Sequence, residues 1–358
     1  MRAALERRLN TTWYGEAPPG VLLTLMERLY RYSSARARSR SLANHARDLV
    51  AKPIVVVGNL TAGGSGKTPL VISLCELARE CGLRAAVISR GYGRSGKGHI
   101  VVSRQHTAKD VGDEPLLIAR RTGVPVVVDA SRERAARALF EDNVDIIISD
   151  DGLQRLSLPR MLEFCLVDGQ RGFGNGHLLP AGPLREPVSR LQSVDFVVHH
   201  LADEMAASDM GDYRMHLKAG PLHQLDGDET RSLDEVKEDA APIFAVAGIA
   251  RPGRFFEMLT AMGLHAGTRA FPDHHRYQKS DFDNVPPGSM ILMTEKDAVK
   301  CQGMGLSNAW YVPVDAVLHD SFKKAIMQRF RELVPEPECE PIFESGSDTR
   351  TEPGAPDG

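Results

Sequence analysis

Residues 61–68 read Thr61-Ala62-Gly63-Gly64-Ser65-Gly66-Lys67-Thr68 and give the strongest signal in the sequence. The apolar run PIVVVGNL (53–60) before it predicts a buried strand, and residues 69–81 after it predict a helix. A glycine-rich turn between a strand and a helix is the setting of a phosphate-binding loop. In such a loop, backbone N–H groups turn toward phosphate oxygens at the positive end of the helix.

Two side chains of this loop have predicted parts in nucleotide binding. Lys67 is expected to bridge the terminal phosphates, and Thr68 to place its hydroxyl on Mg²⁺. Thr61 stands where such loops usually carry their first glycine. The alternative is a chance glycine-rich turn, but the order of strand, Gly-Ser-Gly-Lys-Thr and helix favours the phosphate loop.

The following part of the chain alternates apolar strands with helices. Strands are predicted at 84–93, 125–130, 144–152, 163–169 and 195–201. Runs of β-branched residues joined by helical crossovers are typical of a parallel sheet covered on both faces. The predicted fold class is therefore α/β, a parallel sheet with helices on both faces plus a second, smaller α/β domain.

Composition and pattern divide the chain into five predicted segments. These are a basic, amphipathic membrane-associating segment (1–52), a nucleotide-binding domain (53–211), a linker or hairpin (212–241), a smaller α/β domain (242–334) and an acidic tail (335–358). The tail is rich in Pro, Glu and Gly, so it is expected to be disordered.

The N-terminal segment differs in charge from the whole protein. Residues 1–52 hold ten basic and four acidic residues, whereas the full chain has a net charge of -3. Leu22, Leu25, Met26 and Leu29 recur at helical spacing. Such a stripe followed by arginines can lie on an anionic membrane surface. A helix packed on its own domain is the alternative, which the pattern alone favours slightly.

Composition also excludes several classes of protein. With 44 basic and 47 acidic residues, a broadly basic nucleic-acid binder is excluded. Five cysteines without a C-x-x-C pair argue against a disulfide scaffold or zinc finger and fit a reducing cytosol. We expect no signal peptide, because the N-terminus lacks an apolar core, and no stretch approaches the ~18 apolar residues of a membrane-spanning helix.

Two adjacent carboxylates, Asp150 and Asp151, follow the strand that contains Ile146-Ile147-Ile148. Carboxylates at the end of a strand beside a phosphate loop can hold Mg²⁺ or its water. Two neighbouring negative charges are costly unless a cation or donors neutralise them. A strand-end turn with an aspartate cap is the alternative, but the phosphate loop in the same sheet favours metal binding.

Asp113 precedes a helix predicted over 114–121. The side chain could cap that helix, since aspartate is favoured at this position, or act as a general base for a substrate hydroxyl. The sequence alone favours the cap. His274 in Phe271-Pro272-Asp273-His274-His275 could reach a cleft as an acid/base partner. For this residue a surface histidine is the favoured alternative.

Two glycine-rich loops complete the candidate site. The loop over 172–187 carries Arg185 and Glu186, and its length and fixed kinks are typical of a loop that lines a site. The segment Ser89-Arg90-Gly91-Tyr92-Gly93-Arg94 leaves a predicted strand with two cations near the expected phosphates.

Seven motifs in one order resemble the tetraacyldisaccharide 4'-kinases of lipid A biosynthesis. They are GNLTAGGSGKTP, SRGYGR, VGDEP, ISDDGLQ, GNGHLLPAGPLREP, FPDHHRY and TEKDAVK. The N-terminal Trp13-Tyr14 also matches, and the resemblance runs from about Trp13 to about Phe330. It implies a P-loop kinase-like fold that moves the γ-phosphate of ATP, with Mg²⁺, to the 4'-hydroxyl of a tetraacylated disaccharide 1-phosphate.

The resemblance also implies a place in the cell and roles for residues. The family works at the cytoplasmic face of the bacterial inner membrane, so partners are the acylated lipid and an anionic membrane surface; neither a nucleic acid nor a protein partner is expected. Residues 61–68 correspond to the phosphate loop, Asp113 to the base and His274 to its partner. Asp150 and Asp151 correspond to the acidic pair, and Glu186 to a further carboxylate of the site.

This chain departs from the family pattern in two places. Arg155 stands where the family usually has the His of D-D-G-x-Q-H, and Arg160-Met161 where it tends to have Arg-Asp. Arg155 could meet a phosphate directly.

Two other functions use the same motifs. A nucleotide-hydrolysing switch or ligase predicts phosphate release without a lipid acceptor. A nucleotide-gated membrane-binding module predicts ATP-dependent attachment to liposomes without any product. Asp113, Glu186 and His274 argue against the second, because a binding module needs none of them.

Overall fold

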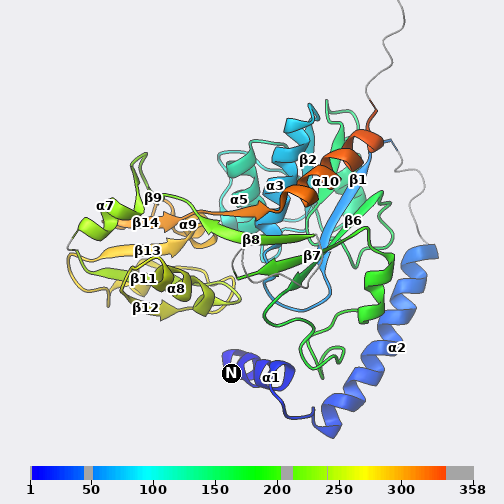
Figure 1. The fold of residues 1–358 in the computed structure, drawn as a ribbon, viewed down its shortest axis with the longest axis horizontal. Helices are drawn as coiled ribbons and strands as arrows, with labels where there is room; N and C mark the ends of the chain where they lie inside the picture. Colours follow the sequence, from blue (N-terminus) through cyan, green and yellow to red (C-terminus); the bar gives the residue numbers. More distant parts are fainter. Residues whose placement is uncertain (1, 44–50, 203–212, 240, 336–358) are drawn as a thin grey trace, which may run out of the picture.

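The computed structural model describes residues 2–43, 51–202, 213–239 and 241–335. Within these residues the chain forms a nine-stranded and a six-stranded sheet, which lie side by side in Figure 1. The predicted acidic tail falls almost entirely outside the described residues. The fold class predicted from the sequence is confirmed.

The large sheet has the strand order β15-β8-β7-β6-β1-β5-β2-β4-β3. All neighbours pair in parallel except the two edge strands, β15 and β3. Its strands are β1 (Ile54–Asn59), β2 (Ala85–Ser89), β3 (Ile100–Val101), β4 (Val126–Val128), β5 (Ile146–Ser149), β6 (Leu162–Asp168), β7 (Phe196–Leu201), β8 (Arg214–Ala219) and β15 (Val314–Leu318).

Helices and loops cover both faces of the large sheet. On one face, α3 (Lys67–Glu80), α5 (Asp113–Thr122) and α10 (Asp320–Leu333) pack into a single apolar core. On the other face lie α6 (Arg132–Arg137) and the loop over 172–187. The short α4 (Ala108–Val111) leads directly into α5. Because β1 is central and its six residues are all buried, the loop that follows it is fixed in the middle of the sheet edge.

The small sheet has the order β10-β9-β14-β13-β11-β12. Its elements are β9 (Leu222–Gln224), β10 (Thr230–Arg231), α7 (Leu233–Glu238), β11 (Ile243–Ala247), α8 (Pro252–Ala261), β12 (Ala266–Ala270), β13 (Met290–Thr294), α9 (Glu295–Cys301) and β14 (Ala309–Val312). One core lies under α8 and a second one under α9.

The junction of the two sheets differs from the sequence prediction. The segment 212–241, predicted as a linker or hairpin, places β8 in the large sheet, whereas β9 and β10 form an antiparallel pair in the small one. Residues 314–333, predicted to complete the smaller domain, form β15 and α10 of the large unit, which is the nine-stranded sheet with its helices. The six-stranded sheet with its helices is the small unit. The reason for the difference is long-range pairing: β15 lies antiparallel to β8, and Phe322 is fully buried in the core of the large sheet.

The N-terminal helices α1 (Arg2–Tyr14) and α2 (Val21–Ala43) dock on the loop over 172–187. The Trp13 indole donates to the Pro180 carbonyl at 2.9 Å, and the Tyr30 hydroxyl donates to the Arg185 carbonyl at 3.0 Å. Buried Glu27 accepts from the Leu178 N–H and contacts His177. In Figure 1, α2 lies along the side of the large unit that faces away from the small sheet.

Candidate functional site

The predicted phosphate loop joins β1 to the first residue of α3, Lys67. Gly66 caps this helix with φ +91°, and Gly63 has φ +111°, a backbone region that favours glycine. No side chain at the cap position accepts from the first-turn N–H groups. The buried Ser65 hydroxyl also has no partner among the described residues. Uncapped N–H groups and an unpartnered hydroxyl are donors that suit an anion.

Lys67 lies across the mouth of this loop. Its Nζ is 3.3 Å from Asp151 Oδ1 and 3.2 Å from Asn59 Oδ1. Asn59 is a fully buried polar residue at the end of β1, and its amide also donates to the Thr61 carbonyl at 2.8 Å. Thr68 is half-buried in the first turn of α3. Sequence reasoning missed Asn59, although a polar residue at the end of an apolar strand could have signalled it.

The acidic pair follows β5, the strand that pairs with β1. Asp150 is buried and accepts a 3.3 Å hydrogen bond from the Ser89 hydroxyl. Burial, together with the negative charges of Glu114 and Asp151, raises the pKa of Asp150 to about 7. A buried carboxylate without a full cationic partner fits a divalent cation. The residues present are therefore compatible with the Mg²⁺ that the sequence predicts.

Asp151 has a different environment from its neighbour. Its φ of +47° is an uncommon conformation for a residue other than glycine, which aspartate tolerates better than most. Burial opposes ionisation, but the positive charges of Lys67 and Arg185 outweigh it and hold the pKa of Asp151 at about 2. Asp151 therefore carries its charge at neutral pH and pairs with the loop lysine.

Asp113 and His274 meet across the two units. His274 Nδ1 lies 3.0 Å from Asp113 Oδ2, and the ring of Tyr92 contacts His274 at a centroid distance of 4.8 Å. Gly112 holds the cap position of α5, with φ +97°, while Asp113 lies in the first turn. Gly112, rather than Asp113, therefore caps α5, and His274 is partly buried against Asp113. The structure thus brings together the two residues that the resemblance pairs, and their roles stay predictions.

Lys296 completes this group and was missed by sequence reasoning. It lies in the first turn of α9, with its Nζ 2.8 Å from Glu114 Oε1 and 3.8 Å from Asp113 Oδ2. Burial raises the pKa of Asp113, but the His274 hydrogen bond and the charge of Lys296 outweigh it, so the pKa lies well below its usual range. The signal in the sequence was a lysine at the end of a predicted strand, in the motif TEKDAVK.

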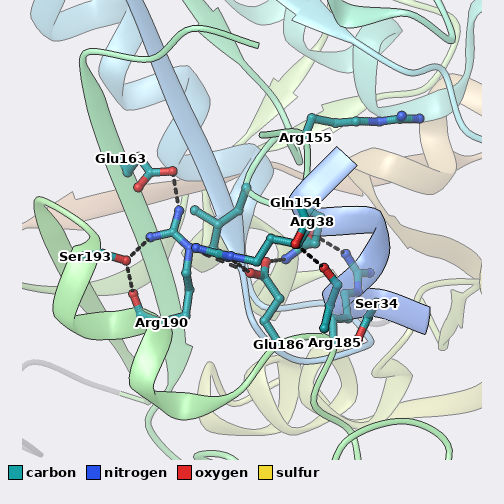
Figure 2. Close-up of polar contacts among 12 residues, drawn as sticks. Ser34, Arg38, Gln154, Arg155, Glu163, Arg185, Glu186, Arg190 and Ser193 are labelled. Carbon is teal, nitrogen blue, oxygen red and sulfur yellow. Dashed lines mark hydrogen bonds and ion pairs between the residues drawn. The ribbon is translucent and has the colours of Figure 1, made fainter. Parts of the chain in front are cut away.

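Glu186 forms a separate group of contacts, shown in Figure 2. It accepts from Arg38 of α2 at 2.8 Å and from the Gln154 amide at 3.1 Å, and its Oε2 lies 3.7 Å from Arg190 Nε. Gln154 Oε1 accepts from Arg185, which also pairs with Asp151 at 3.3 Å. Glu186 is thus linked to the acidic pair through Gln154 and Arg185, rather than through Asp113.

Arg155 is exposed, and its guanidinium extends away from the Glu186 group in Figure 2. The guanidinium makes no hydrogen bond or ion pair with the residues that the structure describes, whereas the backbone of Arg155 bonds to Gly152, Leu158 and Arg160. A second cationic segment, Arg90–Gly98, lines a cavity of about 490 Å³ next to Tyr92.

The apolar stripe of α2 does not pack on the protein. Leu22 is 70% exposed and Leu29 is 72% exposed, while Glu27 and Tyr30 make the contacts to the large unit. The packed helix that the pattern slightly favoured is therefore wrong for this face. Among the described residues, no helix has the length and apolar character needed to cross a membrane.

A parallel sheet whose central strand leads into a phosphate loop, with an acidic pair after the neighbouring strand, defines the class of P-loop kinases. Within this class, the chain belongs to the family described as Tetraacyldisaccharide-1-P 4'-kinase, whose model matches residues 20–331. The family predicted from the sequence is confirmed.

Several known proteins are similar to this chain over most of its length. A tetraacyldisaccharide 4'-kinase of Hahella chejuensis is 44% identical, covering 91% of this chain and 97% of its own. One from Azotobacter vinelandii is 45% identical, covering 89% and 95%. The crystal structure of LpxK from Aquifex aeolicus in complex with ATP is similar with a TM-score of 0.64 and 29% identity, covering 78% of this chain and 88% of that one.

Proposed function

We propose that this protein transfers the γ-phosphate of ATP to the 4'-hydroxyl of a tetraacyldisaccharide 1-phosphate at the cytoplasmic face of the bacterial inner membrane. Family membership supports the reaction. The single observation that carries the assignment of residues is the Asp113–His274 contact, which joins the two units.

Residues 61–68 bind the phosphates of ATP in this proposal. The N–H groups of the loop and of the first turn of α3 hold the oxygens, and Lys67 stabilises charge on the transferring group. Lys67 is already aligned by Asn59 and Asp151, so little reordering is needed. Thr68 and either Asp150 or Asp151 would hold Mg²⁺, whose positive charge would offset the negative charge of the phosphates.

Asp113 accepts the proton of the sugar hydroxyl as its oxygen bonds to phosphorus and ADP leaves. Its low pKa keeps the carboxylate ionised, and proton transfer follows the rising acidity of the hydroxyl during attack. His274 holds the carboxylate in place from the small unit. Since these residues come from different units, closing them would align donor and acceptor and exclude water.

Glu186 acts in this proposal through its neighbours. It fixes the Gln154 amide and Arg38, and thereby keeps Arg185 on Asp151. The exposed Arg155 remains available for a phosphate of the acceptor.

The lipid acceptor explains why an apolar stripe of α2 faces solvent. Val21, Leu22, Leu25 and Leu29 are exposed, and Arg36 and Arg38 follow on the same helix. Such a helix can lie in the interface, and each basic residue near an anionic surface contributes about 1 kcal/mol. We therefore propose that α2 holds the enzyme at the membrane where the acylated substrate resides.

Transfer of radiolabelled γ-phosphate to the lipid acceptor tests this function. Wild type should form labelled lipid with little free phosphate, whereas Lys67→Ala and Asp113→Ala should lose most of the activity. Full activity in either variant would show that the replaced residue does not have the role proposed for it. Phosphate release without acceptor would favour a hydrolase, and ATP-dependent liposome attachment without product would favour a binding module.

A further inference from the structure

A buried histidine at the end of β7 supports the phosphate loop from beneath. His200 is 2% exposed, and its Nδ1 lies 2.8 Å from the carbonyl oxygen of Ser65. A carbonyl oxygen only accepts hydrogen bonds, so Nδ1 must carry the hydrogen and donate it. His200 was not among the residues singled out in the sequence.

This hydrogen bond sets the direction of a loop N–H group. The peptide between Ser65 and Gly66 is planar and trans, so its C=O and N–H point in opposite directions. A carbonyl turned toward His200 therefore turns the Gly66 N–H away from the imidazole. Gly66 itself lies against the ring, since a Cβ at this position would be 2.8 Å from His200 Nδ1. The loop therefore cannot move toward β7 unless His200 also moves.

The imidazole is also in contact with Arg254, which comes from α8 of the small unit. The guanidinium nitrogens of Arg254 lie 3.5 Å from each ring nitrogen of His200. With the hydrogen on Nδ1, Nε2 is the ring nitrogen that can accept from Arg254 Nη2, whereas Nη1 and the protonated Nδ1 are both donors and form no hydrogen bond with each other. The Ser65 carbonyl therefore sets the tautomer. Burial and the charge of Arg254 also lower the pKa of His200 to about 4, so the ring stays neutral and holds one hydrogen.

Asp168, at the end of β6, fixes Arg254 in turn. Its Oδ2 lies 3.4 Å from Arg254 Nη1 and also accepts from Arg251. Its Oδ1 accepts from two backbone N–H groups, those of Gln170 and Arg171. Asp168 is buried, so this carboxylate is a fixed anchor in the large unit for the two arginines of the small one.

The small unit thus touches both the phosphate loop and the base. Ala250, which precedes α8, is close enough to Gly64 that a Cβ there would lie 3.2 Å from its methyl group. The same unit carries His274 to Asp113. One position of the small unit relative to the large one therefore brings Arg254 into contact with His200 and His274 into contact with Asp113.

We propose that His200 is a positioning residue, which holds the Ser65–Gly66 peptide so that the Gly66 N–H donates to the nucleotide phosphates, while Arg254, paired with Asp168, holds the ring in place. This inference rests on the proposed function, because it assumes that the loop binds ATP. It adds that the position of the small unit, through Arg254 and His200, affects the conformation of the phosphate loop.

Binding of Mg·ATP to the purified full-length chain, measured by calorimetry without lipid, tests the proposal. His200→Leu removes the donor, so we expect affinity for Mg·ATP to fall about tenfold, and the KM for ATP to rise equally. The KM for the lipid acceptor should not change. His200→Asn keeps an amide N–H near the position of Nδ1 and should recover affinity to within about threefold. His199→Leu, the same exchange one residue earlier on β7, is the matched control and should bind as wild type.

A second measurement keeps the test independent of folding. Nitrogen-15 spectra of the histidine rings in wild type should show His200 with hydrogen on Nδ1, and Arg254→Gln should shift its Nε2 resonance. Hydrogen on Nε2 in wild type would overturn the proposal, as would wild-type affinity in His200→Leu. If wild type itself takes up no Mg·ATP, the proposed function fails instead, and the two failures are thus distinguishable.

Discussion

Three aspartates of the site show how neighbours decide what a carboxylate does. Asp113 and Asp151 have lowered pKa values because histidine, lysine and arginine groups surround them. Asp150 is more deeply buried than Asp151, and burial, followed by the negative charges of Glu114 and Asp151, raises its pKa to about 7. One residue type thus supplies an ionised base candidate, a partner for Lys67, and a carboxylate that suits a cation.

Replacing Asp113 by Asn should separate catalysis from binding. The amide cannot accept the proton, so we expect kcat to fall about 10²- to 10⁴-fold, the usual contribution of a general base. The KM for ATP should stay within about threefold, because Asp113 does not contact the phosphate loop. Steady-state kinetics measures both, with Asp283→Asn on an exposed turn as the control. An equal loss in the control would show that the assay reports folding.

His200 should make ligand-free stability depend on pH. Its pKa falls from the ordinary 6.5 to about 4 because burial, and then Arg254, disfavour the charged ring. The contribution of the neutral ring to the free energy of unfolding is thus complete above pH 6.5. It is lost as the pH falls from 6.5 toward 4, because in this range the unfolded chain binds a proton that the folded ring does not. Over this range the free energy of unfolding of wild type should fall by about 3 kcal/mol more than that of His200→Asn. Urea denaturation at several pH values measures it, and parallel profiles would contradict the assignment.

At the scale of elements, α2 is tied to the protein by polar residues and leaves its apolar ones outside. Glu27, Tyr30 and Arg38 dock the helix on the loop that carries Arg185 and Glu186. Charge and periodicity identified the stripe in the sequence. They could not say which side of the helix packs, because that depends on where distant residues such as Leu178 lie.

The double variant Leu25→Asp, Leu29→Asp should weaken membrane attachment. Both residues are exposed, so the melting temperature should change little, while binding to anionic phospholipid vesicles should fall at least tenfold. Sedimentation with vesicles measures the bound fraction. Val101→Asp, an exposed position on the edge strand β3, is the matched control. Unchanged vesicle binding in the double variant would rule out α2 as the attachment surface.

In the whole molecule, the small unit is an insertion between two strands of the large sheet. The chain enters it after β8 and leaves it before β15. The large sheet is complete only with β15 and α10, which follow the small sheet in sequence. Gly220 and Pro313, where the chain passes between the sheets, are hydrogen bonded at 3.0 Å. The position of the small unit is thereby constrained by the same sheet that carries the phosphate loop.

Phe322→Ala should therefore destabilise the large unit, although it lies beyond the small one in sequence. The side chain is fully buried among Phe164, Phe196 and Tyr213, so truncation leaves a cavity and should cost about 3–5 kcal/mol. Denaturation followed by loss of Mg·ATP binding reports on this unit. Lys324→Ala on the exposed side of α10 should change stability by less than about 0.5 kcal/mol. Equal effects would contradict the packing of α10 on the large sheet.

Local pattern predicts some parts of this molecule and not others. The strand, loop and helix at 53–80 follow from apolar runs and glycines that are adjacent in sequence, so their order was predictable. The pairing of β15 with β8 joins residues about a hundred positions apart, and no local pattern encodes it. For the same reason, Lys296 and His200 were missed, since each reaches the site only through the fold. The parts assigned to Asp113, His274 and Glu186 rested on resemblance and stay predictions.

Phosphorus-31 spectroscopy of the lipid product, formed from ATP and tetraacyldisaccharide 1-phosphate in vesicles, shows where the transferred phosphate goes. We expect one new phosphomonoester signal, coupled to the proton at the 4' carbon, that grows as ADP appears in equal amount. ADP accompanied by inorganic phosphate, with the lipid spectrum unchanged, would contradict the proposed transfer.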